Sequence, residues 1–257
     1  MTSNIKIKKI NNEVSSIIID EPKTYNSLSF KNLSDLLKAL KKLDADKKVK
    51  VIILEGAGKG FSAGHNLKEV RGLKKRDKYL KLFNLCSKVM LQIVEGRKPV
   101  IAKVHGAAFA AGCQLVASCD LAYSTKDALF ATPGVNIGLF CSTPMVALSR
   151  VVKNKHSMEM LLTGDFIDAD KAKSIGLINN YFSEDELFNK TREMAIKITN
   201  KSSQTVKNGK KAFYNQTEMT ISDAYKYASK IMIENMMNQD SEEGIAAFLE
   251  KRIPNWP

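Results

Sequence analysis

The stretch from Pro99 to Asp120 constrains the fold more than any other part of the chain. Its sequence is PVIAKVHGAAFAAGCQLVASCD, which predicts a strand over Val100–Val104, a loop over His105–Ala108 and a short helix from about Ala110–Gly112. Small residues at such a turn let a ligand approach the backbone, and the first helical turn offers unpaired N–H groups. Two interpretations follow: a site for an anion or a developing oxyanion, or a tight turn that only lets the helix pack on the sheet.

A second loop of small residues favours the ligand site over the tight turn. It spans Gly56–Leu67 and follows an apolar segment, Val51–Leu54, that is predicted to be a strand. Two such loops side by side can offer two backbone N–H groups to one oxygen atom, which is the arrangement of an oxyanion hole. The sequence therefore predicts a site that stabilises negative charge on a carbonyl oxygen.

Both loops resemble those of the crotonase (enoyl-CoA hydratase/isomerase) superfamily. The resemblance is carried by FSAGHNL at Phe61–Leu67 and by PVIAKVHGAAFAAGCQLVASCDLAYS from Pro99 onward, and it extends from Glu21 to Arg252. The segment FATPGVNIGLFCSTP at Phe130–Pro144 is similar to one particular branch of that superfamily. The resemblance implies that an acyl-CoA thioester is the ligand.

The order of the predicted elements indicates an α/β core followed by helices. Strands alternate with helices along most of the chain, with, for example, a helix predicted over Phe30–Asp44 and a strand over Leu177–Tyr181. The pattern is only helical from about Gln204 to Lys251. Alternation alone would suggest a doubly wound sheet. The resemblance implies instead a crotonase-like spiral of ββα units over residues 1–200, which holds the acyl-CoA site, and a C-terminal α-helical trimerisation region over residues 201–257. Such trimers often pair into hexamers.

The resemblance also implies which residues form the site. The two oxyanion-hole donors would be the backbone N–H groups of His65 and Ala111. An acid–base role of the His65 imidazole is the alternative, ranked below its backbone role. Residues expected to contact CoA are Lys23, Tyr25, Ala63, Leu67 and, from an adjacent subunit, Phe248 and Lys251. For Lys23, a solvated loop lysine is the competing interpretation.

The chain departs from the family pattern where hydratases use two glutamates to activate water. Gln114 and Gly134 occupy those positions; an amide is not a general base and glycine has no side chain. Cys141 and Ser142 are expected to line the acyl pocket, since no histidine partner is visible that would make Cys141 a nucleophile. Asn66 stands where an aspartate is common, which leaves it a hydrogen-bonding role. Standard hydration is therefore expected to be weak or absent.

Several functions remain open on this scaffold. One is a different reaction on the same scaffold, that of a decarboxylase, an isomerase or a thioesterase, of which decarboxylation into the oxyanion hole needs little acid–base help. A protein that binds acyl-CoA without catalysis is a second possibility. An RNA-binding relative is a third, which the net charge of +13 permits. Nucleic acid is not favoured, because neither an RNA-binding motif nor a cluster of stacking aromatic residues is present.

Composition sets the remaining expectations. The four cysteines form no CxxC pair, so we expect buried free thiols and no metal site. No tightly bound cofactor is expected, because CoA is part of the substrate. No apolar run reaches the length of a membrane span. The N-terminus shows no targeting segment, which predicts a cytoplasmic location if the source is bacterial.

Overall fold

The larger of two sheets is built around strands rich in Val and Ile, namely those at Val14–Ile19, Val51–Gly56 and Val100–Val104. The computed structural model describes residues 3–257. Its six-stranded sheet has the order β1-β2-β3-β5-β7-β9, in which β1 is antiparallel to β2 and the other neighbours are parallel. The strands are β1 (Ile5–Lys9), β2 (Val14–Ile19), β3 (Val51–Gly56), β5 (Val100–Val104), β7 (Leu121–Thr125) and β9 (Asn180–Phe182). Val51 to Glu55 are all buried, as expected for a parallel strand covered on both faces.

A second, three-stranded sheet turns the fold into a spiral. It consists of β4 (Gly60–Ser62), β6 (Ala107–Phe109) and β8 (Leu129–Ala131), which pair in parallel in that order. Each of these short strands follows a strand of the larger sheet and precedes helical segments, so the chain repeats ββα units. The spiral implied by the resemblance is confirmed, and the doubly wound sheet suggested by alternation is wrong, because the chain enters another sheet before each helical segment.

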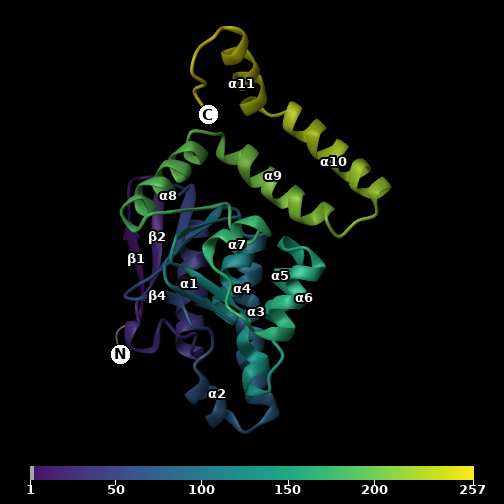
Figure 1. The fold of residues 1–257 in the computed structure, drawn as a ribbon. Coiled ribbons are helices and arrows are strands. Elements are labelled where there is room, and N and C mark those ends of the chain that lie inside the picture. Colours follow the sequence, from purple (N-terminus) through teal and green to yellow (C-terminus); the bar gives the residue numbers. More distant parts are fainter. Residues whose placement is uncertain (1–2) are drawn as a thin grey trace.

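Most helices lie against the sheets, whereas those near the C-terminus extend away from them (Figure 1). Those of the core are α1 (Phe30–Ala45), α2 (Leu67–Leu73), α3 (Arg76–Glu95), α4 (Ala111–Ser118), α5 (Pro144–Val151), α6 (Asn154–Thr163), α7 (Ala169–Ser174) and α8 (Glu184–Thr199). The last three are α9 (Ser203–Gln216), α10 (Ile221–Met236) and α11 (Gln239–Leu249). Single-turn 3-10 helices lie at Pro22–Thr24 and Pro133–Ile137. Within residues 3–257, no helix combines the length and the apolar character needed to cross a membrane.

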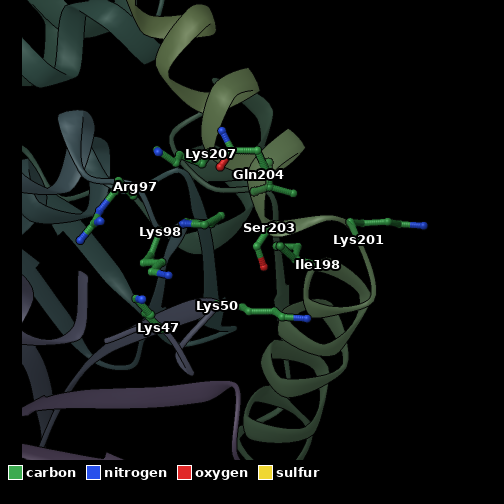
Figure 2. Close-up of a pocket in the computed structure, with 11 residues that line it drawn as sticks. Lys47, Lys50, Arg97, Lys98, Ile198, Lys201, Ser203, Gln204 and Lys207 are labelled. Atoms are coloured by element: carbon green, nitrogen blue, oxygen red, sulfur yellow. The ribbon is translucent and has the colours of Figure 1, made fainter. Parts of the chain in front are cut away.

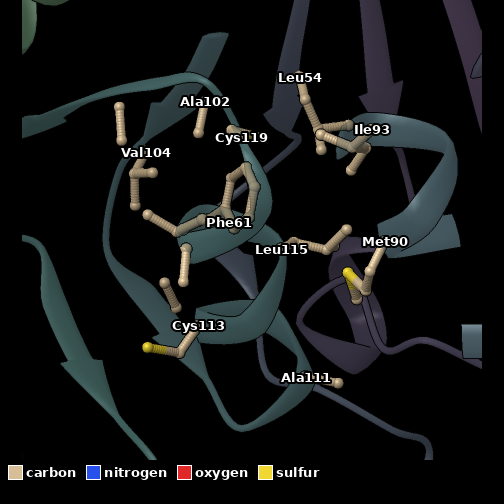
Figure 3. Packing of buried hydrophobic residues seen from close by; sticks show 14 of the residues in the cluster. Leu54, Phe61, Met90, Ile93, Ala102, Val104, Ala111, Cys113, Leu115 and Cys119 are labelled. Atoms are coloured by element: carbon tan, nitrogen blue, oxygen red, sulfur yellow. The ribbon is translucent and has the colours of Figure 1, made fainter. Parts of the chain in front are cut away.

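The buried helix α4 connects the core to the site. All of its residues are buried, and Figure 3 shows Leu115 of α4 and Phe61 of β4 within one cluster of apolar side chains. Full burial of a side chain such as Phe61 contributes roughly 1.5–3 kcal/mol to stability. The packing therefore fixes the beginning of α4 relative to the loop that follows β4.

The C-terminal arm, defined here as residues 203–257, is held to the core at its base. The Lys210 ammonium lies 2.7 Å from the Asp120 carboxylate and donates to the carbonyl oxygens of Ile93 and Lys98 at 2.7 and 2.9 Å. The Tyr214 hydroxyl also donates to Asp120 at 3.0 Å. Beyond this anchor, α10 and α11 extend away from the sheets (Figure 1).

Candidate functional site

The small sheet brings the two small-residue loops together. β4 pairs with β6, with Gly60 opposite Ala107 and Ser62 opposite Ala108. Just past β4, Gly64 has a φ of +87°, and a Cβ atom there would lie 2.9 Å from the Phe109 oxygen and 3.1 Å from the Ala111 nitrogen. Only glycine fits this close approach of two backbones. The two loops are therefore in contact beside the first residue of α4.

The two predicted donors are free backbone N–H groups. Ala110, which precedes α4, has φ 47° and ψ −114°. Residues other than glycine rarely adopt this backbone conformation. Its own N–H donates to the Ala131 oxygen at 2.9 Å. Among residues 3–257, no group accepts a hydrogen bond from the N–H of His65 or of Ala111. A strained residue beside an unused donor is typical of a functional turn.

Asn26 joins the loop before α1 to the first of these loops. Its side chain is fully buried; it accepts the Glu21 N–H at 2.9 Å and donates to the carbonyl oxygens of Ala57 and Gly60 at 2.7 Å each. The sequence pattern contained Asn26 but did not reveal this clamp. The asparagine thereby fixes the loop that carries two predicted CoA contacts.

Three predicted CoA contacts lie close together on the surface. Lys23 and Tyr25 are exposed in the loop held by Asn26. The Ala63 N–H donates to the Tyr25 oxygen at 2.9 Å, so Ala63 adjoins them. Leu67, at the start of α2, is 56% exposed. All four are exposed within residues 3–257, which leaves them accessible to a ligand.

The His65 imidazole is neutral and half-buried. Its Nδ1 lies 3.2 Å from the Leu28 carbonyl oxygen, so Nδ1 carries the proton and Nε2 is an acceptor. The ring packs edge-on against Phe83 with centroids 5.5 Å apart, and Nε2 is buried without a hydrogen-bond partner. Burial lowers the pKa of His65, and this effect exceeds the opposing influence of the Leu28 carbonyl and of Glu69. The side chain is therefore not a cation at neutral pH.

Gln114 lies in a nonpolar environment one turn into α4. It is 4% exposed, and its Oε1 is 3.9 Å from the Cys86 Sγ on α3. Burial raises the pKa of the Cys86 thiol to about 12, so the sulfur stays protonated. In the described part of the chain, no hydrogen bond joins the Gln114 side chain to a carboxylate. The amide accordingly has no adjacent acid or base.

The loop after β8 fills the space beside Gly134. A Cβ atom at Gly134 would lie 2.2 Å from the Leu139 carbonyl oxygen and 2.9 Å from the Cys141 Sγ. The Leu139 N–H also donates to the Gly134 oxygen at 2.9 Å, which holds the loop in this position. Cys141 is buried against Gly134, whereas Ser142 is exposed. A glutamate at Gly134 would require the loop to move.

Asn66 has a structural role. Its side chain caps α2 by accepting the N–H groups of Lys68 and Glu69, each at 3.1 Å. Its amide also donates to the Ser27 hydroxyl at 3.3 Å. The hydrogen-bonding role left to this residue by the loss of the aspartate is therefore observed.

Phe248 and Lys251 do not join the site within one chain. Phe248 is 82% exposed near the end of α11, and Lys251 is exposed just after it. Figure 1 shows α11 at the opposite end of the molecule from α2. Their contact with CoA remains a prediction that requires an adjacent subunit.

No metal site is found in the part of the chain that the structure describes. The four cysteines are buried free thiols, as expected. Burial raises the pKa of the Cys113 thiol to about 12 and raises that of Cys141 as well. Neither sulfur is therefore activated as a nucleophile.

Comparison with known proteins identifies the relatives of this chain. The family model described as enoyl-CoA hydratase/isomerase matches residues 9–257. The Xenopus laevis protein named enoyl-CoA hydratase domain-containing protein 3, mitochondrial, is 44% identical over 240 residues, which cover 93% of this chain and 82% of the relative. The Homo sapiens protein of the same name is 46% identical over 244 residues, covering 95% and 80%. The branch indicated by Phe130–Pro144 is confirmed.

Solved structures agree with these relatives. An enoyl-CoA hydratase from Mycobacterium smegmatis has a TM-score of 0.96 at 46% identity, with 98% of each chain covered. Human enoyl-CoA hydratase domain-containing protein 3 has a TM-score of 0.95 at 43% identity, covering 98% of this chain and 100% of that chain. The predicted crotonase fold is confirmed.

The expected cytoplasmic location is wrong, as the names of the curated relatives indicate. The vertebrate relatives are named as mitochondrial proteins. Residues that fold into a core do not encode a compartment, because address signals are separate segments that receptors recognise.

Proposed function

The chain belongs to the enoyl-CoA hydratase/isomerase family, and we propose that it binds an acyl-CoA thioester and polarises the thioester carbonyl. The observation that carries the proposal is the pair of unused N–H groups of His65 and Ala111 on two loops that touch at Gly64. Donors that are already oriented stabilise an enolate oxygen without reorganisation, and the loss of one donor costs roughly 10²–10³ in rate.

The exposed loops provide the surface for the CoA moiety. Lys23 would contact a phosphate, while the Tyr25 ring and the Ala63 and Leu67 backbones border the adenosine. We propose that the chain forms a trimer, or a dimer of trimers, in which Phe248 and Lys251 of an adjacent subunit complete this surface. The exposure of these two residues in the single chain supports that arrangement.

The proposed reaction differs from standard hydration. General acid–base groups contribute about 10²–10⁴ in rate, and neither Gln114 nor Gly134 can supply one. The space that a second glutamate would need is occupied by the Leu139 oxygen and the Cys141 sulfur. Decarboxylation, which leaves its electron pair as an enolate and needs little acid–base help, fits the residues present better than addition of water to an enoyl double bond. Isomerisation through an enolate and thioester cleavage through a tetrahedral oxyanion would use the same two donors.

A screen of CoA thioesters tests the proposal. Saturated, enoyl and carboxyacyl thioesters are incubated with the protein, and substrate loss and products are measured by mass spectrometry alongside binding. We expect saturable binding of several thioesters and slow hydration of crotonyl-CoA. Failure of every thioester to bind would contradict the proposed ligand, and crotonyl-CoA turnover equal to that of an efficient hydratase would contradict the proposed weak hydration.

A single substitution isolates the role of Gln114. Gln114→Glu restores one carboxylate, and we expect crotonyl-CoA hydration to rise only slightly because the second carboxylate is still missing. The matched control is Gln239→Glu, at an exposed position on α11, which should leave hydration unchanged. Gly134→Glu is not a suitable second restoration, because its side chain would collide with the Leu139 carbonyl.

A further inference from the structure

A cavity at the base of the C-terminal arm has no role in the proposed acyl-CoA chemistry. It encloses about 210 Å³ where α9 leaves the core. Figure 2 shows the lining residues on four segments, namely the α1–β3 connection, the α3–β5 connection, the end of α8 and the beginning of α9. The Lys98 side chain lies among the others, whereas those of Lys50 and Lys201 extend away from them. Its lining residues are Lys47, Lys50, Arg97, Lys98, Pro99, Ile198, Lys201, Ser203, Gln204, Val206 and Lys207.

Positive charge dominates this cavity, since none of its lining side chains is acidic. Two of the cations already have carboxylate partners outside the lining: Arg97 lies 3.1 Å from Asp44, and Lys50 lies 2.8 Å from Glu13. The remaining four form no salt bridge with any residue in the range 3–257. They are Lys47, Lys98, Lys201 and Lys207. Among residues 3–257, no carboxylate therefore forms a direct ion pair with these four cations.

Lys98 is the most confined of these cations. Burial lowers its pKa, and the nearby charges of Arg97 and Lys207 act in the same direction, against Asp44 and Asp46. Keeping like charges near a half-buried ammonium costs free energy, and a bound anion would relieve that cost. Asp44 and Asp46 offset part of this cost, and a bound anion would offset more of it.

The beginning of α9 adds neutral donors to the cations. In the described residues, no acceptor is found for the N–H groups of Ser203 and Gln204 in the first helical turn. The Ser202 hydroxyl is occupied, because it accepts the Thr205 N–H at 3.0 Å. Free first-turn N–H groups and the positive helix end favour anionic oxygens in the same place as the lysines.

The cavity is separate from the acyl-CoA site. Lys50 directly precedes β3, and Lys98 lies two residues before the first residue of β5, so the cavity lies at the amino ends of these strands. The loops with His65 and Ala111 follow the carboxyl ends. A strand of this length spans about 17–20 Å, so the two sites lie at opposite edges of the sheet.

We propose that this cavity binds a compact polyphosphate, either a free chain of two or three phosphates or the phosphate end of a nucleotide. Four lysines without partners match the charge of such a ligand. The volume is below the roughly 300–1,000 Å³ of ordinary ligand pockets, which fits a phosphate chain better than a whole nucleotide. None of the described residues that line the cavity is aromatic and could stack on a base, which disfavours a nucleic-acid strand.

Binding would connect the arm to the core. The ligand would contact Lys47 and Lys98 on the core side and Ser203 and Lys207 on α9. It would therefore add to the anchor formed by Lys210 and reduce opening of the α8–α9 connection.

Calorimetric titration of the full-length protein in about 0.15 M KCl tests the proposal, with tripolyphosphate, ATP and adenosine as probes. We expect one tripolyphosphate per chain, with Kd of about 10–100 μM, and no adenosine binding. Equal affinities for ATP and tripolyphosphate would support recognition of the phosphate chain alone; tighter ATP binding would identify a nucleotide as the source. A Kd above about 1 mM for both, or tighter binding of single-stranded RNA, would overturn the proposal.

Matched variants locate the binding. Lys98→Met with Lys207→Met should weaken tripolyphosphate binding at least about tenfold. Lys153→Met with Lys155→Met removes the same charge from the exposed start of α6 and should change Kd less than about twofold. An equal loss of tripolyphosphate affinity in both double variants would show a general charge effect. A loss of affinity in Lys23→Met would place the ligand in the CoA site. Either result overturns the proposal.

Hydrogen exchange of the unmodified protein provides an answer that does not depend on the variants folding. Tripolyphosphate should slow exchange of the amides of Arg97, Lys98 and residues 203–207. Protection confined to the loops around Lys23 and Ala63 would contradict binding in this cavity.

Discussion

α1 and α10 are both helices of 16 residues with an apolar stripe, yet their apolar side chains have opposite environments. α1 buries Leu33, Leu36 and Leu40 against the sheet, whereas α10 buries no residue. Along α10 and just after it, Ile221 and Met237 are 79% and 83% exposed. The apolar residues of α1 are therefore buried and stabilise the core. Those of α10 are exposed and available to contact another surface.

This difference indicates that the core and the C-terminal arm have different roles. The core is closed by its own packing and fixes the loops of His65 and Ala111. The C-terminal arm is held by a few polar contacts at its base and presents apolar residues outward. We expect changes in the core to alter folding or chemistry, and changes at the end of the arm to alter assembly and CoA binding.

A matched pair of phenylalanine truncations should give the largest contrast. Phe61→Ala removes a fully buried ring from the core and should lower the free energy of unfolding by about 3–5 kcal/mol. Phe248→Ala, at an 82% exposed position, should leave the stability of the single chain unchanged and weaken CoA binding. Chemical denaturation measures the first effect. Equal destabilisation by both variants would contradict the division between core and arm.

The anchor of the arm gives the next largest effect. Lys210→Met leaves the Asp120 carboxylate buried without its cation and should cost about 3 kcal/mol. Amide exchange should accelerate in α9 and α10 while the strands of the core stay protected. The double variant Lys210→Met with Asp120→Asn serves as the control, because it removes both charges and should recover part of the loss. Uniform exchange throughout the chain would mean that the arm and the core unfold together.

Assembly should depend on the exposed face of the arm. Met237→Glu places a charge on it and should weaken self-association at least about tenfold, since burying a methionine contributes roughly 1.5–3 kcal/mol. Met237→Leu should preserve association. Sedimentation at micromolar concentration measures both. A wild-type chain that stays monomeric and binds CoA with full affinity would contradict the proposed trimer.

The pH dependence of the free energy of unfolding should give the smallest effect. All three histidines lie in the core and none in the C-terminal arm, so we expect the histidine contribution to arise in the core. Burial lowers the pKa of His65 from its reference value of 6.5. The unfolded chain therefore takes up a proton first, and stability falls as the pH drops below about 6.5. The free energy of unfolding of His65→Gln should change less between pH 7 and 5. The partly exposed His156→Gln should behave like the wild type; equal slopes for all three proteins would refute this role of His65.

The sequence predicted the large elements and missed the small sheet. The strand over Val51–Leu54 and the helix over Phe30–Asp44 are found nearly at their expected limits, because long apolar patterns report burial directly. β4 and β6 fall within segments expected to be loops. Their glycine, alanine and serine residues have low strand propensity, and tertiary pairing alone makes them strands.

The candidate site was also predictable only in part, because only some of its residues belong to local sequence motifs. The resemblance pointed to His65 and Ala111, and the structure shows their N–H groups free on adjoining loops. The Asn26 clamp and the crowding at Gly134 depend on residues distant in the chain, which no local pattern contains. The strand expected over Leu177–Tyr181 begins later, at Asn180, because Leu177 and Ile178 are buried in the turn before it.

The N–H groups of His65 and Ala111 are proposed to polarise a thioester carbonyl. Infrared difference spectra of butyryl-CoA labelled with ¹³C at the carbonyl measure this directly. We predict that binding shifts the carbonyl stretch to lower frequency than in water. Replacing Ala111 by its α-hydroxy acid removes the donor with little change in shape, unlike Ala111→Pro, whose ring would crowd Gly64. The ester variant should lose part of the shift. Bound thioester with the frequency it has in water, or an unchanged shift in the ester variant, would contradict the claim.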